Sequence, residues 1–501
     1  MKVLLVSSYR VSCGIATYAE VLETLLARAF DVTVYALDQS ILKSRVPHVV
    51  KVGDRQIQEL CATFKDFDVV NLQWEPGLLG DETSHITRRL GMILAAADKL
   101  ILTVHTVVPY PRQKTVLGFL QHMRKFGLSR FYGYLLDRTH SYEKETYRLL
   151  HERAKSSKKT FVAVHTPRET EFFKNVVGFE HVYDHPLSLI QAGWPERLAE
   201  DGPRARRELE SAFPDRKRFI GVFGFLSEYK GITTALRAMK LLDKDSQLLI
   251  YGGVHPGALQ ERQSVNPYVK SLMSEIEADV AKSPPSTRSK DDDPAHKDDA
   301  GEYALGDLDA RDIPRDSIDG LGTPEAAAGA EAPGGRGKPD RISGATSGSD
   351  DRGSAQEPAY KPKRSNTLLD KVAFLGSPDD YEFALAISAV DVCVFPYLEV
   401  GQSGSGPVSM AIELGKPTIT SRNRAFIELA RYYPKKFEMI DIGNHIQLAQ
   451  VIERVSKRPA ADQPVRYDSA TLTDFYGDLI RDIAGRPAAA RPVEVVRTRA
   501  A

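Results

Sequence analysis

The sequence is poor in cysteine, with three among 501 residues, at Cys13, Cys61 and Cys393. Three cysteines so far apart exclude a disulfide framework and a CxxC zinc site. Such sparse use is typical of a reducing compartment. No run of about 18 consecutive apolar residues occurs, so we expect no transmembrane helix. The apolar opening at residues 1–6 is too short for a signal peptide and lacks a small-residue cleavage site. A cytoplasmic protein is therefore expected, with the inner face of the membrane as a further location.

The chain also lacks net charge, because 67 Lys and Arg balance 67 Asp and Glu. This balance argues against a histone-like or tail-driven nucleic-acid binder, and no recognition module is visible, so we expect no nucleic-acid partner. Signals for metal binding are equally sparse. Of the DxD triplets, 66–68 opens a strand, while 291–293 and 307–309 lie in a polar stretch. No His or Cys cluster has ligand spacing. We expect no metal and no resident cofactor.

Short β-branched apolar runs alternate along the chain with longer amphipathic stretches. Strands that alternate with helices indicate βαβ units and parallel sheets with helices on both faces. The runs form two series of five, separated by a weakly patterned stretch near 185–216. The sequence therefore predicts an α/β protein with two doubly wound domains. The runs are KVLLVSS, DVTVYAL, DVVNLQW, KLILTVHT and TFVAVHT, then FIGVFGF, QLLIYGG, VAFLGS, VDVCVFP and PTITS.

Residues 283–367 interrupt this pattern. They hold six Ile, Leu, Val or Phe against 20 Gly plus Pro, and 17 acidic against 12 basic side chains. Such a segment cannot bury enough apolar surface to offset the entropy lost on ordering. We expect a long disordered insertion in the second domain, either a tolerated loop expansion or a regulatory segment. Residues 486–501, rich in Ala, Arg and Pro, are expected to form a disordered tail.

In parallel α/β domains, ligands bind at the carboxyl ends of the strands. Gly14 follows the first strand and precedes an amphipathic helix, where it would let backbone amides approach an anion. His105 ends the fourth strand and could hydrogen-bond a substrate. Glu75 and His165 occupy comparable strand ends with weaker support. Each also has an ordinary structural interpretation, as a turn glycine or a buried polar side chain.

The second series carries stronger signals. Gly224 follows a strand, and Lys230 stands at the mouth of the next helix, as a diphosphate contact would. The loop Gln402-Ser403-Gly404-Ser405-Gly406 offers amides and hydroxyls to a phosphate or sugar. Pro407 favours a helix start there. Glu413, about two turns on, could accept hydrogen bonds from a ribose diol.

Together these segments resemble the retaining nucleotide-sugar glycosyltransferases of family four, which have the GT-B fold. The resemblance covers most of the chain outside the insertion and the tail. It rests on Gly14 and on six segments: TVHTVVP, GFLSEYKGITTAL, LLIYGG, VAFLGSPDD, AVDVCVFPYLEVG and QSGSGPVSMAIELGKPTITS.

The resemblance implies two facing Rossmann-like domains with a deep cleft between them. Residues 1–188 would form the N-terminal acceptor domain, joined by a returning C-terminal helix at 469–484. Residues 189–468 would form the C-terminal nucleotide-sugar donor domain.

The resemblance also implies a role for each candidate. Lys230 would contact the donor diphosphate, Glu413 would hold the ribose, and His105 would face the transferred sugar. Loop 376–381 would lie near the base. The implied donor-binding residues are Gly14, Gly224, Ser403, Gly404, Ser405, Gly406 and Asp379.

Two positions depart from the family pattern. Ser405 stands eight residues before Glu413, where the first glutamate of the family's paired motif would fall, and Phe225 replaces the usual arginine. The implied activity is a hexosyl- or mannosyl-type transfer with retention, in polysaccharide or related glycan assembly. The alternatives are a GT-B sugar-nucleotide epimerase and a non-catalytic nucleotide-sugar-binding scaffold or sensor.

Residues 112–159 hold 12 Lys or Arg against 4 Asp or Glu, with interleaved aromatics. A basic, aromatic-bearing surface suits an anionic membrane face. We therefore expect a glycan or lipid-linked acceptor and a peripheral membrane contact, although a solvated charged face would have the same composition.

Overall fold

The computed structural model describes residues 1–11, 13–107, 142–254, 266–282, 367–399, 401–456 and 466–486. These residues belong to one compact unit. The predicted disordered insertion lies outside the described residues except for Thr367, and the predicted tail lies outside them except for Arg486.

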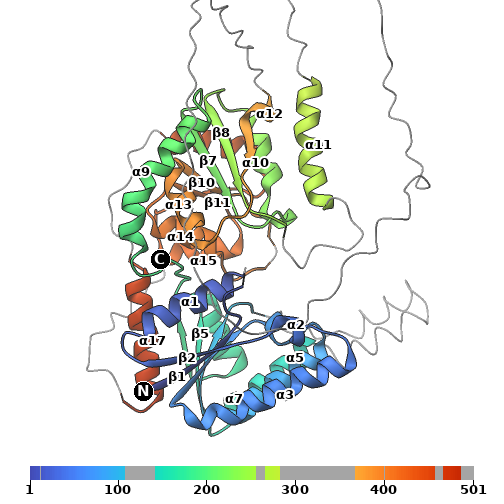
Figure 1. Ribbon diagram of the computed structural model, residues 1–501, viewed down its shortest axis with the longest axis vertical. Coiled ribbons are helices and arrows are strands. Elements are labelled where there is room, and N and C mark those ends of the chain that lie inside the picture. Colours follow the sequence, from blue (N-terminus) through green and yellow to red (C-terminus); the bar gives the residue numbers. More distant parts are fainter. Residues whose placement is uncertain are drawn as a thin grey trace, which may run out of the picture. The chain divides into compact units, whose positions relative to one another are not determined.

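The first half of the chain forms a six-stranded sheet with the strand order β2-β1-β3-β4-β5-β6 (Figure 1). Every neighbouring pair is parallel. The strands are β1 (Lys2–Ser7), β2 (Asp31–Ala36), β3 (Val69–Trp74), β4 (Lys99–Val104), β5 (Lys159–Val164) and β6 (His181–Asp184). The helices are α1 (Gly14–Leu26), α2 (Gln39–Leu42), α3 (Pro47–Thr63), α4 (Pro76–Leu79), α5 (Thr83–Ala96), α7 (Tyr142–Lys155) and α8 (Pro167–Phe172).

The second half forms another parallel six-stranded sheet, with the order β12-β11-β10-β7-β8-β9. Its strands are β7 (Arg218–Phe223), β8 (Ser246–Tyr251), β9 (Val372–Phe374), β10 (Val392–Phe395), β11 (Thr418–Ser421) and β12 (Glu438–Ile440). Its helices are α9 (Trp194–Ala212), α10 (Ile232–Met239), α11 (Pro267–Lys282), α12 (Leu368–Lys371), α13 (Asp380–Ala389), α14 (Gly406–Glu413), α15 (Arg424–Tyr432) and α16 (His445–Val455), with a 3-10 turn, η3, at Glu228–Lys230.

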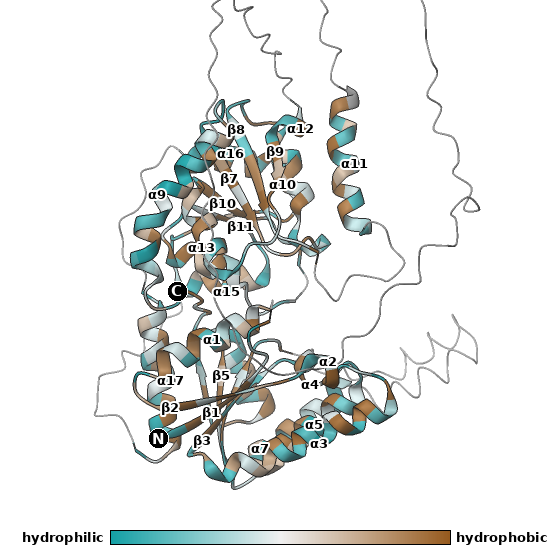
Figure 2. Ribbon diagram, in the orientation of Figure 1, coloured by the Kyte–Doolittle hydropathy of each residue, from teal (hydrophilic) through white to brown (hydrophobic). Residues whose placement is uncertain are grey.

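The central strands are buried on both faces, as parallel sheets covered by helices require. Every residue of β3 and of β8 is buried. The strands are largely brown in Figure 2, whereas α9 is largely teal and buries only Trp194, Leu198 and Gly202. The expectation of two doubly wound parallel domains is confirmed, and the ten predicted runs are all strands. Two further short strands, β6 and β12, complete the sheets.

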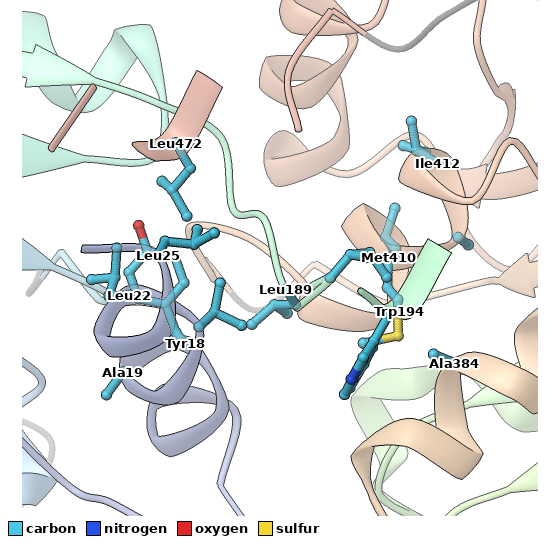
Figure 3. Close-up of a cluster of buried hydrophobic side chains, with 14 of the residues drawn as sticks. Tyr18, Ala19, Leu22, Leu25, Leu189, Trp194, Ala384, Met410, Ile412 and Leu472 are labelled. Carbon is cyan, nitrogen blue, oxygen red and sulfur yellow. The ribbon is translucent and has the colours of Figure 1, made fainter. Parts of the chain in front are cut away.

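A last helix, α17 (Ser469–Ile483), packs against α1, β4 and β5 of the first sheet. The phenol of Tyr476 lies between the side chains of Thr103 and Tyr18. The end of the described chain therefore returns to the first sheet. One apolar cluster joins α1 and α17 to residues 189–194 and the helices α13 and α14 (Figure 3).

Candidate functional site

A pocket of about 360 Å³ lies at the carboxyl ends of strands from both sheets. Segments that follow β1, β3 and β4 form one wall, segments that follow β7, β8, β9 and β10 form the other, and two leucines come from the connection between the sheets. The lining residues include Cys13, Gly14, Ile15, Thr17, Glu75, His105, Thr106, Leu187, Leu189, Gly224, Phe225, Tyr229, Lys230, Ser377, Asp380, Gln402, Ser403, Gly404, Ser405, Gly406, Pro407 and Met410.

The strand order explains why the pocket forms here. In the first sheet, β2 and β3 lie on opposite sides of β1; in the second, β8 and β10 lie on opposite sides of β7. At such switch points the loops diverge and leave a crevice at the carboxyl edge. Both crevices open into this one pocket, and the segments after β1 and β7 contain Gly14 and Lys230.

Lys230 is the cation of the pocket wall, and its side chain is 7% exposed. Its Nζ donates a hydrogen bond to the hydroxyl of Tyr397 at 2.7 Å. Burial lowers the pKa of Lys230 to about 7, and no acidic side chain in the described part of the chain opposes that shift. A buried ammonium without a carboxylate partner is costly. An anionic ligand would compensate it.

Two glycines make room for this lysine. A Cβ on Gly224 would lie 3.3 Å from Cε and Nζ of Lys230, and Gly224 has a φ of 116°. Gly231 has a φ of 64°, and a Cβ there would lie 2.0 Å from the carbonyl oxygen of Pro396. Any larger residue at Gly231 would push the η3 turn away from the end of β10. These glycines therefore hold the lysine against the pocket.

Two helices begin at the pocket. Gly14 is the first residue of α1 and Gly406 the first residue of α14, and neither helix has an acidic side chain in its first turn. The unpaired amides and the positive end of the dipole at such a start attract anions. A Cβ on Gly14 would meet no atom within 4 Å, so its backbone is open to a ligand. The pocket thus presents two helix starts and one buried cation.

The loop before α14 reaches the pocket. Ser403, Gly404, Ser405 and Gly406 all line it. The hydroxyl of Ser405 lies 3.1 Å from that of Tyr397, and Ser403 hydrogen-bonds the buried carboxyl of Glu169. A Cβ on Gly406 would lie 2.5 Å from Leu189, so this glycine allows the loop to approach the connecting segment closely.

Glu413 is not among the residues that line the pocket. Both of its carboxyl oxygens are buried, facing the hydroxyl of Ser188 and the amides of Leu189 and Ile190 without completing hydrogen bonds to any described group. Burial raises the pKa of Glu413 to about 8. Met410, nearly one turn earlier on α14, faces the pocket instead. The structure therefore places Glu413 beneath the wall, against the connection between the sheets.

His105 lines the pocket, but both of its ring nitrogens are occupied. Its Nε2 donates to Oε1 of Gln73 at 2.8 Å, and its Nδ1 lies 3.2 Å from Nε2 of His165. Nδ1 of His165 in turn faces the carbonyl of His185, which can only accept a hydrogen bond, so this nitrogen donates.

These contacts fix the orientation of the His105 ring. Burial lowers the pKa of His105 well below its usual value, so the ring is neutral at neutral pH. The ring is an oriented, uncharged part of the pocket wall. It can hydrogen-bond a sugar only if its contact with Gln73 or with His165 breaks. His165 itself lies behind His105, outside the pocket lining.

The two remaining candidates differ in position. Glu75 lines the pocket, and burial raises its pKa while a hydrogen bond with Thr106 opposes the shift. Asp379 does not line it; its side chain caps α13 in a reciprocal bond with Glu382. The neighbouring Asp380 lines the pocket and accepts a hydrogen bond from Thr17 of α1 at 2.8 Å.

The basic region 112–159 is only partly described, because residues 108–141 lie outside the described part. In the remainder, Arg148 pairs with Glu145 and Glu152, and Lys158 pairs with Asp98. Arg153 is buried and donates to two backbone carbonyls. Much of this charge is therefore satisfied within the protein.

No helix in the described part of the chain is both long and apolar enough to span a membrane. In the same residues, no three His, Cys, Asp or Glu side chains gather in a way that could hold a metal ion.

No protein-family model and no curated protein matches this sequence. Solved structures do resemble it. An α,α-trehalose 6-phosphate synthase from Burkholderia multivorans has a TM-score of 0.55 at 10% identity, covering 98% of this chain and 99% of its own. A sucrose-phosphate synthase from Thermosynechococcus elongatus has a TM-score of 0.54 at 12% identity, with 97% and 99% covered. Anabaena HepE in complex with UDP-glucose has a TM-score of 0.52 at 12% identity, with 96% and 100% covered.

At these identities the similarity defines the fold. The protein has the GT-B fold: two parallel six-stranded sheets with flanking helices, whose carboxyl edges share one pocket.

The sequence did not point to several residues that shape the pocket. Nothing in the sequence marks Tyr397 as a site residue, because a tyrosine after a buried strand resembles a core residue. Gln73 looks like an ordinary position of β3. Thr17 and Asp380 meet only because the two sheets face one another, and their separation of 363 residues hides the pair.

Proposed function

We propose that this protein is a glycosyltransferase that moves a sugar from a nucleotide-diphospho-sugar to a glycan, lipid-linked or polysaccharide acceptor, with retention of anomeric configuration. The transferred group is of the hexosyl or mannosyl type. The reaction needs no metal and no resident cofactor, and the donor is a co-substrate.

The observation that carries the proposal is the buried ammonium of Lys230 between the starts of α1 and α14. A diphosphate is a compact dianion. It would compensate this charge and accept hydrogen bonds from the backbone amides at both helix starts. Anabaena HepE, with the same fold, is described in complexes with UDP and with UDP-glucose. A uridine diphosphate donor is thus the first to test.

The proposed reaction does not require an acidic or basic side chain of the protein to transfer a proton. The bond between the sugar carbon and the diphosphate oxygen breaks, and the acceptor oxygen bonds to that carbon on the same face. The acceptor proton passes to the leaving diphosphate, so no protein base is obligatory. The main contribution of the protein is to stabilise charge on the departing diphosphate. We assign this role to Lys230 and the two helix starts.

A thermal-shift panel with UDP, GDP, ADP, CDP and dTDP tests the donor site. A ligand present at about 100 times its dissociation constant stabilises the folded state by roughly 2.7 kcal/mol. We expect at least one nucleotide to raise the melting temperature by several degrees. The matching nucleoside, which lacks the diphosphate, should give a much smaller shift. The absence of any shift across the panel would contradict the proposal.

Phe225 favours one alternative, a nucleotide-sugar-binding scaffold or sensor. It lines the pocket at the position where the resemblance implies an arginine, so the diphosphate would meet one fewer cation. Tight nucleotide binding without sugar transfer to any acceptor would support the scaffold. Release of a free epimerised sugar would instead support a GT-B epimerase.

We also propose that residues 112–159 contact an anionic membrane at its cytoplasmic face. Basic residues near such a surface contribute about 1 kcal/mol each. Because Arg148, Arg153 and Lys158 are engaged within the protein, most of this attraction is assigned to 112–141.

Co-sedimentation with phosphatidylserine vesicles tests the membrane contact. The protein should sediment at low salt and be released at high salt, where surface charges are screened. Reversing the charges of Lys125 and Arg130 should weaken binding about tenfold or more. The membrane contact would be rejected if the protein does not bind vesicles at low salt, or if neither high salt nor the charge reversals weaken its binding.

A further inference from the structure

Tyr397 lies behind the pocket wall, two residues after the end of β10. It is fully buried, and its hydroxyl touches two pocket residues that come from different loops. Nζ of Lys230 lies 2.7 Å from that hydroxyl, and Oγ of Ser405 lies 3.1 Å from it. Tyr397 therefore connects the cation after β7 to the hydroxyl before α14.

The direction of the first hydrogen bond follows from chemistry. An ammonium can only donate, so the oxygen of Tyr397 accepts from Lys230. In the pair of Tyr397 and Ser405, either hydroxyl can donate. When Tyr397 donates, the hydroxyl hydrogen of Ser405 is available to an acceptor in the pocket. The three groups thus form one hydrogen-bonded series with a pocket residue at each end.

We infer that Tyr397 is a positioning residue, whose hydroxyl holds Lys230 and Ser405 as a single array of donors for the diphosphate of the donor substrate. This inference rests on the proposed function for its ligand. The arrangement of the three side chains does not depend on which nucleotide or sugar is bound.

The surroundings of the ammonium show why one hydroxyl matters. Nζ of Lys230 lies 4.0 Å from the ring centroid of Tyr397 and 4.8 Å from that of Tyr229. Gly224 packs close to it on a third side, where a Cβ would lie 3.3 Å from Nζ. The two rings attract a cation, but the Tyr397 hydroxyl is its one hydrogen-bond acceptor among the described residues. Without it, the neutral amine would be favoured.

Loss of the hydroxyl should therefore change the protonation of Lys230 in the free protein. Burial lowers its pKa to about 7 in the protein that has Tyr397, with no acidic side chain from η3, β10 or α14 contributing. A hydrogen bond to a charged group contributes at least about 1.4 kcal/mol, which corresponds to one pKa unit. Tyr397→Phe keeps the ring and removes only this bond.

The first experiment measures the ammonium directly, in the full chain without ligand. Pulses of acetic anhydride across a pH series, read by mass spectrometry of the peptide that contains Lys230, report when the amine becomes neutral. The midpoint should lie near pH 7 in the wild type, following its pKa of about 7, and about one unit lower in Tyr397→Phe.

Tyr433→Phe is the matched control. Tyr433 is equally buried, and its hydroxyl donates to the carbonyl of Tyr467, outside the pocket lining. This variant should lose a buried hydroxyl without moving the Lys230 midpoint. A midpoint unchanged by Tyr397→Phe would overturn the inference, as would an equal change in Tyr433→Phe.

The second experiment titrates UDP-glucose calorimetrically, because its diphosphate does not change charge near neutrality. Tyr397→Phe should weaken binding about tenfold at about pH 8 and about twofold at about pH 6, because the protonated fraction of Lys230 differs most above its pKa. Ser405→Ala should also weaken binding. The double variant should be little worse than either single one, because the two hydroxyls act together.

The outcomes separate the two claims. A lowered labelling midpoint without binding of any nucleotide sugar would reject the proposed function and leave the positioning of Lys230 in place. Equal weakening at both pH values, or additive effects in the double variant, would mean that Tyr397 supports the pocket only by packing, and the inference would fail.

Discussion

Replacing Lys230 with methionine should lower sugar transfer by about 10²-fold or more, because a lost charge-stabilising donor typically costs that much. The same variant should make the free protein more stable. Lys230 is buried in the absence of an acidic partner, and its pKa falls to about 7. A lowered lysine pKa means that folding favours the neutral amine, so the charge destabilises the fold at and below pH 7. Methionine removes that penalty at similar volume.

Two assays measure these effects. Sugar transfer is followed by the release of nucleoside diphosphate from the sugar conjugate of the nucleotide that raises the melting temperature, and stability is followed by thermal melts of the free protein. An increase in melting temperature of about 2 °C or more would match roughly 1 kcal/mol. Lys371→Met is the matched control, because Nζ of the fully buried Lys371 donates to the carbonyls of Met239 and Leu242. That variant should lose stability and keep its turnover per folded molecule. Near-normal turnover in Lys230→Met would reject the assignment.

The free energy of unfolding should fall as the pH rises from about 5 to about 8, and replacing Glu413 with glutamine should remove most of this fall. Burial raises the folded pKa of Glu413 to about 8, above its ordinary value of 4.5. The folded state therefore holds an extra proton between these values, and stability falls as pH rises through that window. The full loss is on the order of 5 kcal/mol. Glutamine cannot ionise, so the variant should be more stable than the wild type at about pH 8.

Urea unfolding at about pH 5 and about pH 8 measures this difference. Nucleotide affinity should stay within about twofold of the wild type, because both carboxyl oxygens are buried away from the pocket. A tenfold loss of affinity would instead place Glu413 on the ribose, as the family resemblance implied. Equal pH dependence in variant and wild type would show that the carboxyl is ionised throughout.

The strands were predictable because each is a β-branched run that needs burial on both faces. Once parallel sheets are assumed, the ligand edge follows, and Gly14, Lys230 and the 403–406 loop are found by inspecting strand ends. The helix α9 was missed, because Pro203 lies inside it and it buries few residues. The strands β6 and β12 are too short to stand out, with four and three residues.

The inner wall of the site was less predictable, since it depends on the direction in which each side chain points. Pro407 indicates the start of α14 but not which residues of that helix face the pocket, and the structure turns Met410 toward the pocket and Glu413 away from it. The contacts of Tyr397 also needed the structure, because they join residues 167 and 8 positions apart.

A crystal structure of the full chain with UDP-glucose would show where the donor diphosphate binds. The diphosphate should lie between the starts of α1 and α14, with an oxygen within hydrogen-bond distance of Nζ of Lys230. A nucleotide bound elsewhere, or a diphosphate that leaves Lys230 without contact, would contradict this prediction.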